Sequence, residues 1–151
     1  MTSKLNIKQS LIAGLMAGIT AAVINGILFL IFHSTGVISD DIYPKPNEPM
    51  TIVPVVMASI IPALIGSLIF FLLEKFTNKG FNIFAIATGI LTVLSLYSPF
   101  TVIPGVTTGY ALVLCVMHIV VPVSLLYFIR RAKQTKDIKQ VKESNTSFQT
   151  T

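Results

Sequence analysis

A stretch of fifty residues without a charged side chain limits what this chain can fold into. From Gly80 to Ile129 there is no Asp, Glu, Lys or Arg. Over the whole chain 53% of the residues are apolar and 11% are charged, whereas soluble domains contain roughly a quarter charged residues. A soluble domain would expose part of such a stretch to water, so the run indicates segments that lie in a bilayer.

Four apolar runs are long enough to cross a membrane. A spanning helix needs about 20 residues at a rise of about 1.5 Å each. The predicted spans cover about residues 11–33, 51–73, 81–98 and 108–129, and Pro104-Gly105 is the strongest turn signal in the charge-free run. The sequence therefore predicts an all-α fold, a polytopic membrane protein whose four transmembrane helices form one bundle domain over residues 1–132.

Lys and Arg are distributed unequally between the two ends of these spans. One side carries ten of them and the other side carries only Lys45. The ten are Lys4, Lys8, Lys75, Lys79, Arg130, Arg131, Lys133, Lys136, Lys139 and Lys142. Because basic residues beside a span are retained in the cytoplasm, we expect a multi-pass protein of the cell membrane with both termini cytoplasmic.

Small residues form a regular row in the first span. Gly14, Gly18, Ala22 and Gly26 recur every four residues and so lie on one helix face. Helices in lipid associate through such faces, because small side chains let two backbones approach closely. The row is either a dimerisation surface or the packing face for the other helices of the same chain, and we favour the second interpretation.

Three prolines lie within spans, Pro54 in the first turn of the second span and two others in span interiors. Pro62 and Pro122 lack a backbone N–H and clash with the preceding turn, so they leave the carbonyls of Ala58 and His118 without their usual donors. Each interior proline is interpreted either as a hinge or as a static kink that shapes the bundle, and we favour the kink.

Two polar side chains are expected deep in the membrane. Asn25 lies on the order of 12 Å, and His118 on the order of 15 Å, from the outer end of its span by helix rise. If the first and fourth spans are neighbours, the two can form a hydrogen bond that fixes helix register. The alternative is a small polar pocket, joined by Cys115, that contacts a ligand or relays a proton.

The C-terminal part beyond the fourth span is rich in lysine and polar residues. We expect residues 133–151 to be a basic, disordered cytoplasmic tail. Since the net charge of +5 is concentrated beside apolar spans, anionic lipid headgroups are a better counter-charge than nucleic acid. Arg130, Arg131, Lys133 and Lys136 are the predicted headgroup contacts.

Reactive groups are scarce in the predicted spans. The chain has two histidines and one cysteine, and no acidic residue lies within a span. Neither a metal site nor a Ser-His-Asp or paired-carboxylate set can be assembled from them. We therefore expect no cofactor, no metal and no enzymatic activity.

Three apolar stretches resemble a bacterial family of four-helix membrane proteins known only as a domain of unknown function. They are GLMAGITAAVINGILFLI, SIIPALIGSLIFFLLEK and LVLCVMHIVVPV, in the first, second and fourth spans. The resemblance covers nearly the whole chain up to Arg131 and implies the fold and a bacterial inner-membrane location, but no activity. The polar positions that it includes are Asn25 and His118.

The sequence favours a non-enzymatic scaffold or a subunit of a membrane assembly, with a second copy or another membrane protein as partner. The alternative is a small transporter or channel for a neutral or anionic solute, with Asn25 and His118 in its pocket. Four-helix multidrug exporters are similar in size, but they depend on an intramembrane glutamate, and none is present in the spans.

Overall fold

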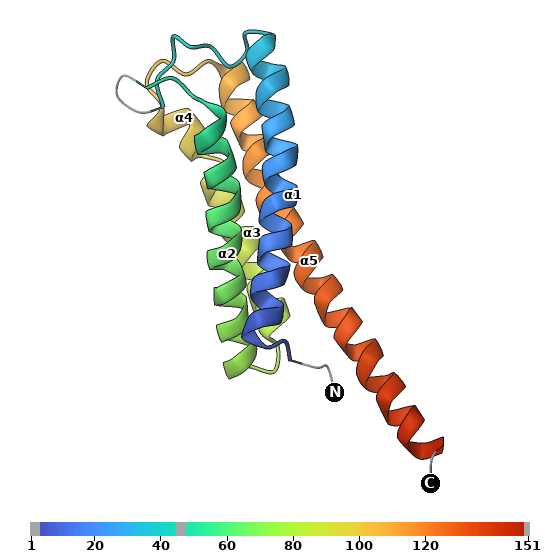
Figure 1. Ribbon diagram of the computed structural model, residues 1–151. Coiled ribbons are helices and arrows are strands. Elements are labelled where there is room, and N and C mark those ends of the chain that lie inside the picture. The colour runs from blue at the N-terminus through green and yellow to red at the C-terminus, as the bar shows by residue number, and fades with distance from the viewer. Residues whose placement is uncertain (1–3, 45–47, 150–151) are drawn as a thin grey trace.

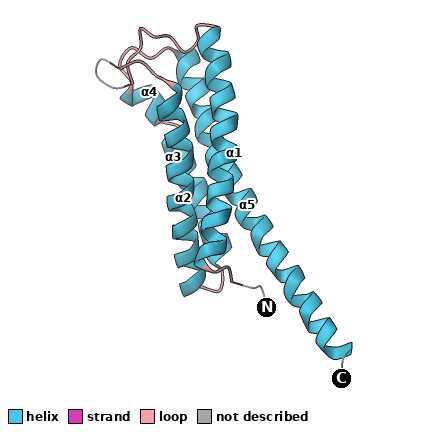
Figure 2. Ribbon diagram, viewed as in Figure 1, coloured by secondary structure: helices cyan, strands magenta, loops and turns pink. Residues whose placement is uncertain are grey.

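The protein is described from a computed structural model that covers residues 4–44 and 48–149, and over these residues it is helical with no strand (Figures 1 and 2). The helices are α1 (Ile7–Ser34), α2 (Ile52–Phe76), α3 (Gly80–Ser95), the short α4 (Ser98–Val102) and α5 (Thr108–Gln149). Within this described part, four helical segments are long and apolar enough to span a membrane, with α3 and α4 together making the third. The predicted all-α, four-span membrane fold is confirmed.

The four spans run side by side between two different ends (Figure 1). At the basic end α1 begins, α2 ends and α3 begins, while the loop end holds the α1–α2 connection and α4. Helix α1 packs on α2 and α5, and α3 packs on the same two helices without contacting α1 among the described residues. Helices α2 and α5 therefore separate α1 from α3.

Local signals account for the helix ends. Helix α1 begins with a capping box, in which Asn6 Oδ1 accepts from the Gln9 N–H at 2.8 Å and Gln9 Oε1 accepts from the Asn6 N–H at 3.1 Å. Between α4 and α5, Gly105 has a φ of +68°, a conformation that favours glycine. The predicted Pro104-Gly105 turn is confirmed there.

Apolar clusters close the bundle at its two ends. At the loop end, the connection between α1 and α2 folds back so that Ile38 and Ile42 pack beside Phe29 and Tyr110. At the basic end, Phe70, Phe84 and Ile129 gather beside the start of α1. The middle of the bundle lies between these clusters.

The small-residue row of α1 lies against α2. All four members, Gly14, Gly18, Ala22 and Gly26, are buried in the single chain. A Cβ added at Gly18 would lie 3.0 Å from the Cα of Ile60, which is backbone of the neighbouring helix. This face is therefore used for packing within the chain.

The C-terminal segment differs from its predicted disorder. Helix α5 continues without a break through residues 133–149, well beyond the rest of the bundle (Figure 1). The segment is rich in Lys, Gln and Glu, which are good helix formers, and it extends a helix whose costly nucleus already exists in the membrane span. The structure corrects the prediction for these residues, while 150 and 151 lie outside the described part.

We expect Gly14→Ala to destabilise the protein, because the new Cβ would lie 2.4 Å from both Cβ and Oγ of Ser67 on α2. Overpacking of this kind lowers the free energy of unfolding by about 1–3 kcal/mol. Thermal unfolding in one detergent should show a lower Tm than wild type. Gly26→Ala is the matched control, because its Cβ would meet only Ile52 Cδ1 at 3.8 Å. Equal Tm values for both variants would contradict the assigned packing.

Candidate functional site: a cleft between α2, α3 and α5

A cleft of about 580 Å³ lies between α2, α3 and α5, with Asn25 of α1 at its inner wall. Most of its lining is apolar, including Ile65, Leu91 and Val121. Its size falls within the roughly 300–1,000 Å³ of small-molecule sites, which are also mostly apolar with a few polar groups. It is the candidate functional site.

The cleft exists because α3 packs loosely. Only Gly80 and Phe84 of α3 are buried, and both lie toward the basic end. Small residues such as Ala58 and Ala87 line the walls of the cleft. Farther along α3, Leu91 is 65% exposed although it lines the cleft. The outer half of α3 therefore leaves space that the other helices do not fill.

Asn25 links three helices at the wall of the cleft. Its side chain is 3% exposed, and its Nδ2 donates to Ser59 Oγ of α2 at 3.0 Å and to the Met117 carbonyl of α5 at 3.1 Å. The Met117 carbonyl can only accept, so it fixes which amide atom is the nitrogen. Asn25 Oδ1 is then left buried and without a partner among the described residues.

His118 lies on α5 and borders the same cleft. Its Nδ1 is 2.7 Å from the Leu114 carbonyl one turn earlier in the helix. Because a carbonyl only accepts, Nδ1 carries the hydrogen, and in the neutral ring Nε2 is then an acceptor. No hydrogen bond of the described residues uses that Nε2.

The structure brings Asn25 and His118 to one cleft but does not join them. Among the hydrogen bonds of the described residues, none links the two side chains, and Asn25 bonds instead to the residue before His118. Cys115 does not line the cleft, since its thiol contacts the Leu96 carbonyl at 3.4 Å. The geometry is that of a shared pocket rather than of a polar pair.

Both interior prolines border the cleft as well. Pro62 and Pro122 line it together with Ala58 and His118, the residues four positions earlier. Helices α2 and α5 continue through the prolines. The missing N–H groups leave the carbonyls of these two lining residues, Ala58 and His118, without their regular intrahelical donors.

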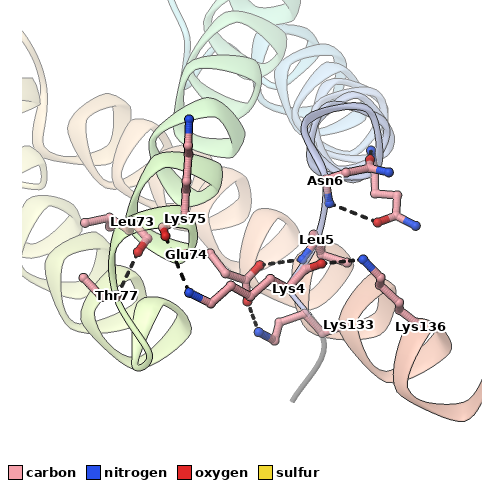
Figure 3. A network of polar contacts seen from close by, with 10 residues as sticks. Lys4, Leu5, Asn6, Leu73, Glu74, Lys75, Thr77, Lys133 and Lys136 are labelled. Carbon is pink, nitrogen blue, oxygen red and sulfur yellow. Dashed lines mark hydrogen bonds and ion pairs between the residues drawn. The ribbon is translucent and has the colours of Figure 1, made fainter. Parts of the chain in front are cut away.

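At the basic end, Glu74 is the centre of a second polar cluster (Figure 3). This carboxylate is 2% exposed. It accepts from the Leu5 backbone N–H at 3.0 Å and forms an ion pair with Lys133 of α5. The Lys136 ammonium donates to the Lys4 carbonyl, and Lys4 Nζ reaches the Lys75 carbonyl at 3.5 Å. The cluster fastens the segment before α1 to α2 and α5.

Glu74 is not among the site residues predicted from the sequence. The predicted spans leave this residue in the short connection between the second and third spans, whereas it belongs to the last turn of α2. The available signal was that Glu74 is the only acidic residue between Glu48 and Asp137. A single carboxylate among so many basic flanking residues predicts a paired position rather than a solvated one.

The four predicted headgroup contacts fall into two groups. Lys133 and Lys136 are partly buried in the basic-end cluster and bind protein groups there. Arg130 and Arg131 are exposed on α5. The side chains of the two arginines therefore lie outside the Glu74 cluster.

No metal site is built from the described residues, because no three His, Cys, Asp or Glu side chains gather in one place. Likewise, the polar side chains of the cleft include neither a carboxylate nor a cation. Their arrangement can donate, accept and exclude water, but it offers no pair of an acid and a base for proton transfer.

We expect Lys133→Met to lower the Tm strongly, because it leaves the buried Glu74 carboxylate without its cation. Removing one partner of a buried pair costs up to about 3–5 kcal/mol. The double variant Glu74→Met/Lys133→Met should recover much of that loss, as measured by a thermal double-mutant cycle in detergent. Lys139→Met, at an exposed position of α5, should leave the Tm unchanged. A double variant no more stable than Lys133→Met alone would argue against the pair.

Comparison with known proteins gives a family and no activity. The model of DUF6069, described as a family of unknown function, matches residues 6–135. Neither the curated proteins nor the solved structures contain a match to the chain. The predicted resemblance to a membrane protein family of unknown function is confirmed.

Proposed function

The chain belongs to DUF6069, a family of unknown function, and we propose that it is a non-enzymatic integral membrane protein that binds a small, largely apolar molecule. The binding site is the cleft between α2, α3 and α5. The observation that carries this proposal is a cleft of about 580 Å³ that is lined along α2 from Val55 to Leu73. Two polar residues that are almost fully buried, Asn25 of α1 and Ser59 of α2, border it.

The dimensions of the cleft favour a small molecule over a partner helix. A spanning helix has a diameter of about 10 Å and a length of about 30 Å, so it occupies several times the volume of the cleft. A single lipid-like or drug-sized molecule fits the measured space. Apolar ligands reach such a cleft from the hydrocarbon region without crossing water.

Transport extends this proposal. A transporter needs a site near the bilayer midplane that is lined by interrupted or kinked helices. The cleft lies beside Pro62 and Pro122, and it contains no charged residue. A neutral solute is therefore the better candidate for passage, and these two prolines are the candidate hinges.

A scaffold or assembly subunit is the second candidate function. Helix α3 is the observation that favours it, because half of its residues, including Ile86 and Leu94, are exposed in the single chain. A second copy or another membrane protein would cover that face. The small-residue row of α1 gives this candidate no support, since it already packs on α2.

We also propose that the protein lies in the bacterial inner membrane with both termini in the cytoplasm. The unequal distribution of Lys and Arg supports this orientation. Arg130 and Arg131 would then reach anionic headgroups of the cytoplasmic leaflet, with about 1 kcal/mol of attraction for each basic residue near the surface.

The orientation can be tested with single cysteines in a Cys115→Ser background. In intact cells, a membrane-impermeant maleimide should label Glu48→Cys, at the loop end, and should label Gln140→Cys, on the α5 extension, only after permeabilisation. Both positions are exposed, so access to the reagent decides the outcome. Labelling of Gln140→Cys in intact cells would reverse the proposed topology.

Ligand binding can be tested with a photoactivatable long-chain alkane that carries a diazirine. In purified protein, we expect saturable labelling of peptides from α2, α3 and α5 that line the cleft. Ala87→Phe fills the cleft from α3 and should reduce labelling roughly tenfold or more, because the added ring occupies the space of the probe.

The matched control is Ala85→Phe, the same change on α3 at a position that does not line the cleft. It should be labelled like wild type. Labelling that is unsaturable, or that Ala87→Phe and Ala85→Phe reduce equally, would refute binding in the cleft.

A further inference from the structure

We propose that the cleft selects neutral molecules that carry a hydroxyl group, because almost every polar group lining it presents an acceptor. This inference rests on the proposed function and names the class of ligand. The inference depends on which polar groups of the lining already donate their hydrogens to other protein atoms.

The donors at the α1–α2 wall are already used. Both hydrogens of Asn25 Nδ2 are directed to Ser59 Oγ and to the Met117 carbonyl. The Ser59 hydroxyl donates its one hydrogen to the Val55 carbonyl at 2.9 Å. Asn25 Oδ1 remains as a buried acceptor without a partner among the described residues.

The α5 and α3 walls follow the same pattern. His118 donates from Nδ1 to Leu114, which leaves Nε2 as an acceptor. On α3, Thr92 Oγ1 donates to the Thr88 carbonyl and Ser95 Oγ donates to the Thr92 carbonyl, each at 2.7 Å. Thr88 is the exception in the lining, since its hydroxyl has no hydrogen bond to the described residues and stays free to donate.

The backbone adds acceptors and no donors. Proline has no N–H, so Pro62 and Pro122 leave the carbonyls of Ala58 and His118 without their i+4 donors. All four residues border the cleft. In a bilayer, an unsatisfied carbonyl costs several kcal/mol unless a hydroxyl, water or a neighbouring helix reaches it.

This arrangement discriminates between ligand classes. A hydroxyl supplies the hydrogen that these acceptors lack. An ether or ester brings only further acceptors, for which Thr88 is the single free hydroxyl donor among the described lining residues, and a carboxylate adds a charge where the lining has no Lys or Arg. An ammonium ion would find no carboxylate in the lining either. The geometry therefore favours neutral hydroxyl compounds and disfavours the anionic solutes of the transport hypothesis.

His118 is the first acceptor that a ligand meets. His118 is an exposed residue that lines the cleft, whereas Asn25 is 3% exposed at the inner wall. The ligand hydroxyl should therefore donate to Nε2 of His118, with its chain along the apolar lining. Asn25 Oδ1 is the deeper acceptor, reached once the neighbouring side chains shift.

The test is competition against the photoactivatable alkane in the purified full-length protein. Two competitors, 1-hexadecanol and hexadecyl methyl ether, have the same alkyl chain, and only the alcohol has a hydrogen to donate. Palmitate is the third competitor and tests an anionic headgroup. In wild type, hexadecanol should displace the probe at roughly fivefold to tenfold lower concentration than the ether, as expected for one net hydrogen bond of about 1 kcal/mol. Palmitate should be weaker than hexadecanol.

His118→Phe removes the acceptor and should reduce the preference for the alcohol to less than about twofold. His118→Gln is the conservative variant, because its amide can donate to Leu114 and keep an oxygen acceptor, and it should retain the preference. His33→Phe makes the same change outside the cleft, at a histidine that bonds Asp40 at 3.0 Å, and should behave like wild type.

The two proposals fail differently. Probe that never labels wild-type protein saturably overturns the proposed function together with this inference. Saturable labelling with equal displacement by alcohol and ether overturns the inference alone, as does an alcohol preference that survives both His118→Phe and Asn25→Leu. Tighter competition by palmitate than by hexadecanol also overturns it.

Discussion

The close approach of α1 and α2 is the contact on which the rest of the bundle depends. Lipid removes the driving force that apolar side chains provide in water, so helices must gain their association energy from packing at short range. Gly14 and Gly18 allow this, since any larger side chain would meet Ser67 or the backbone of Ile60. Helix α5 then packs across this pair, and Asn25 bonds to both α2 and α5.

Helix α3 lacks such a contact, and the cleft is the consequence. Only Gly80 and Phe84, in its first turns, are buried. Near the end of α3, the Cys115 thiol of α5 donates to the carbonyl of Leu96, the residue after the helix, at 3.4 Å. The same chain thus combines a tightly packed pair of helices with one loosely held helix, and the space between them has the size of a ligand site.

The fold was predictable from the sequence because spans depend on local properties. Length, absence of charge and the Pro104-Gly105 turn are each visible in a window of about 20 residues. The partners of the small-residue row are not local, and neither is the environment of Glu74, which depends on three separate segments meeting at one end. For Asn25 and His118 the sequence indicated a shared depth. It could not indicate that Asn25 would bond the neighbouring carbonyl of Met117, because helix rotation about its axis is set by packing.

The C-terminal extension of α5 was mispredicted for a related reason. A polar composition indicates disorder when a segment must fold by itself. Here the segment continues a helix that the membrane span already nucleates, and each added residue then gains a hydrogen bond without a new nucleation cost. Lys133 and Lys136 also bind groups of the basic-end cluster, so the first turns of the extension are held by tertiary contacts. The same contacts connect the position of this extension to the end of α2, the helix that forms one wall of the cleft.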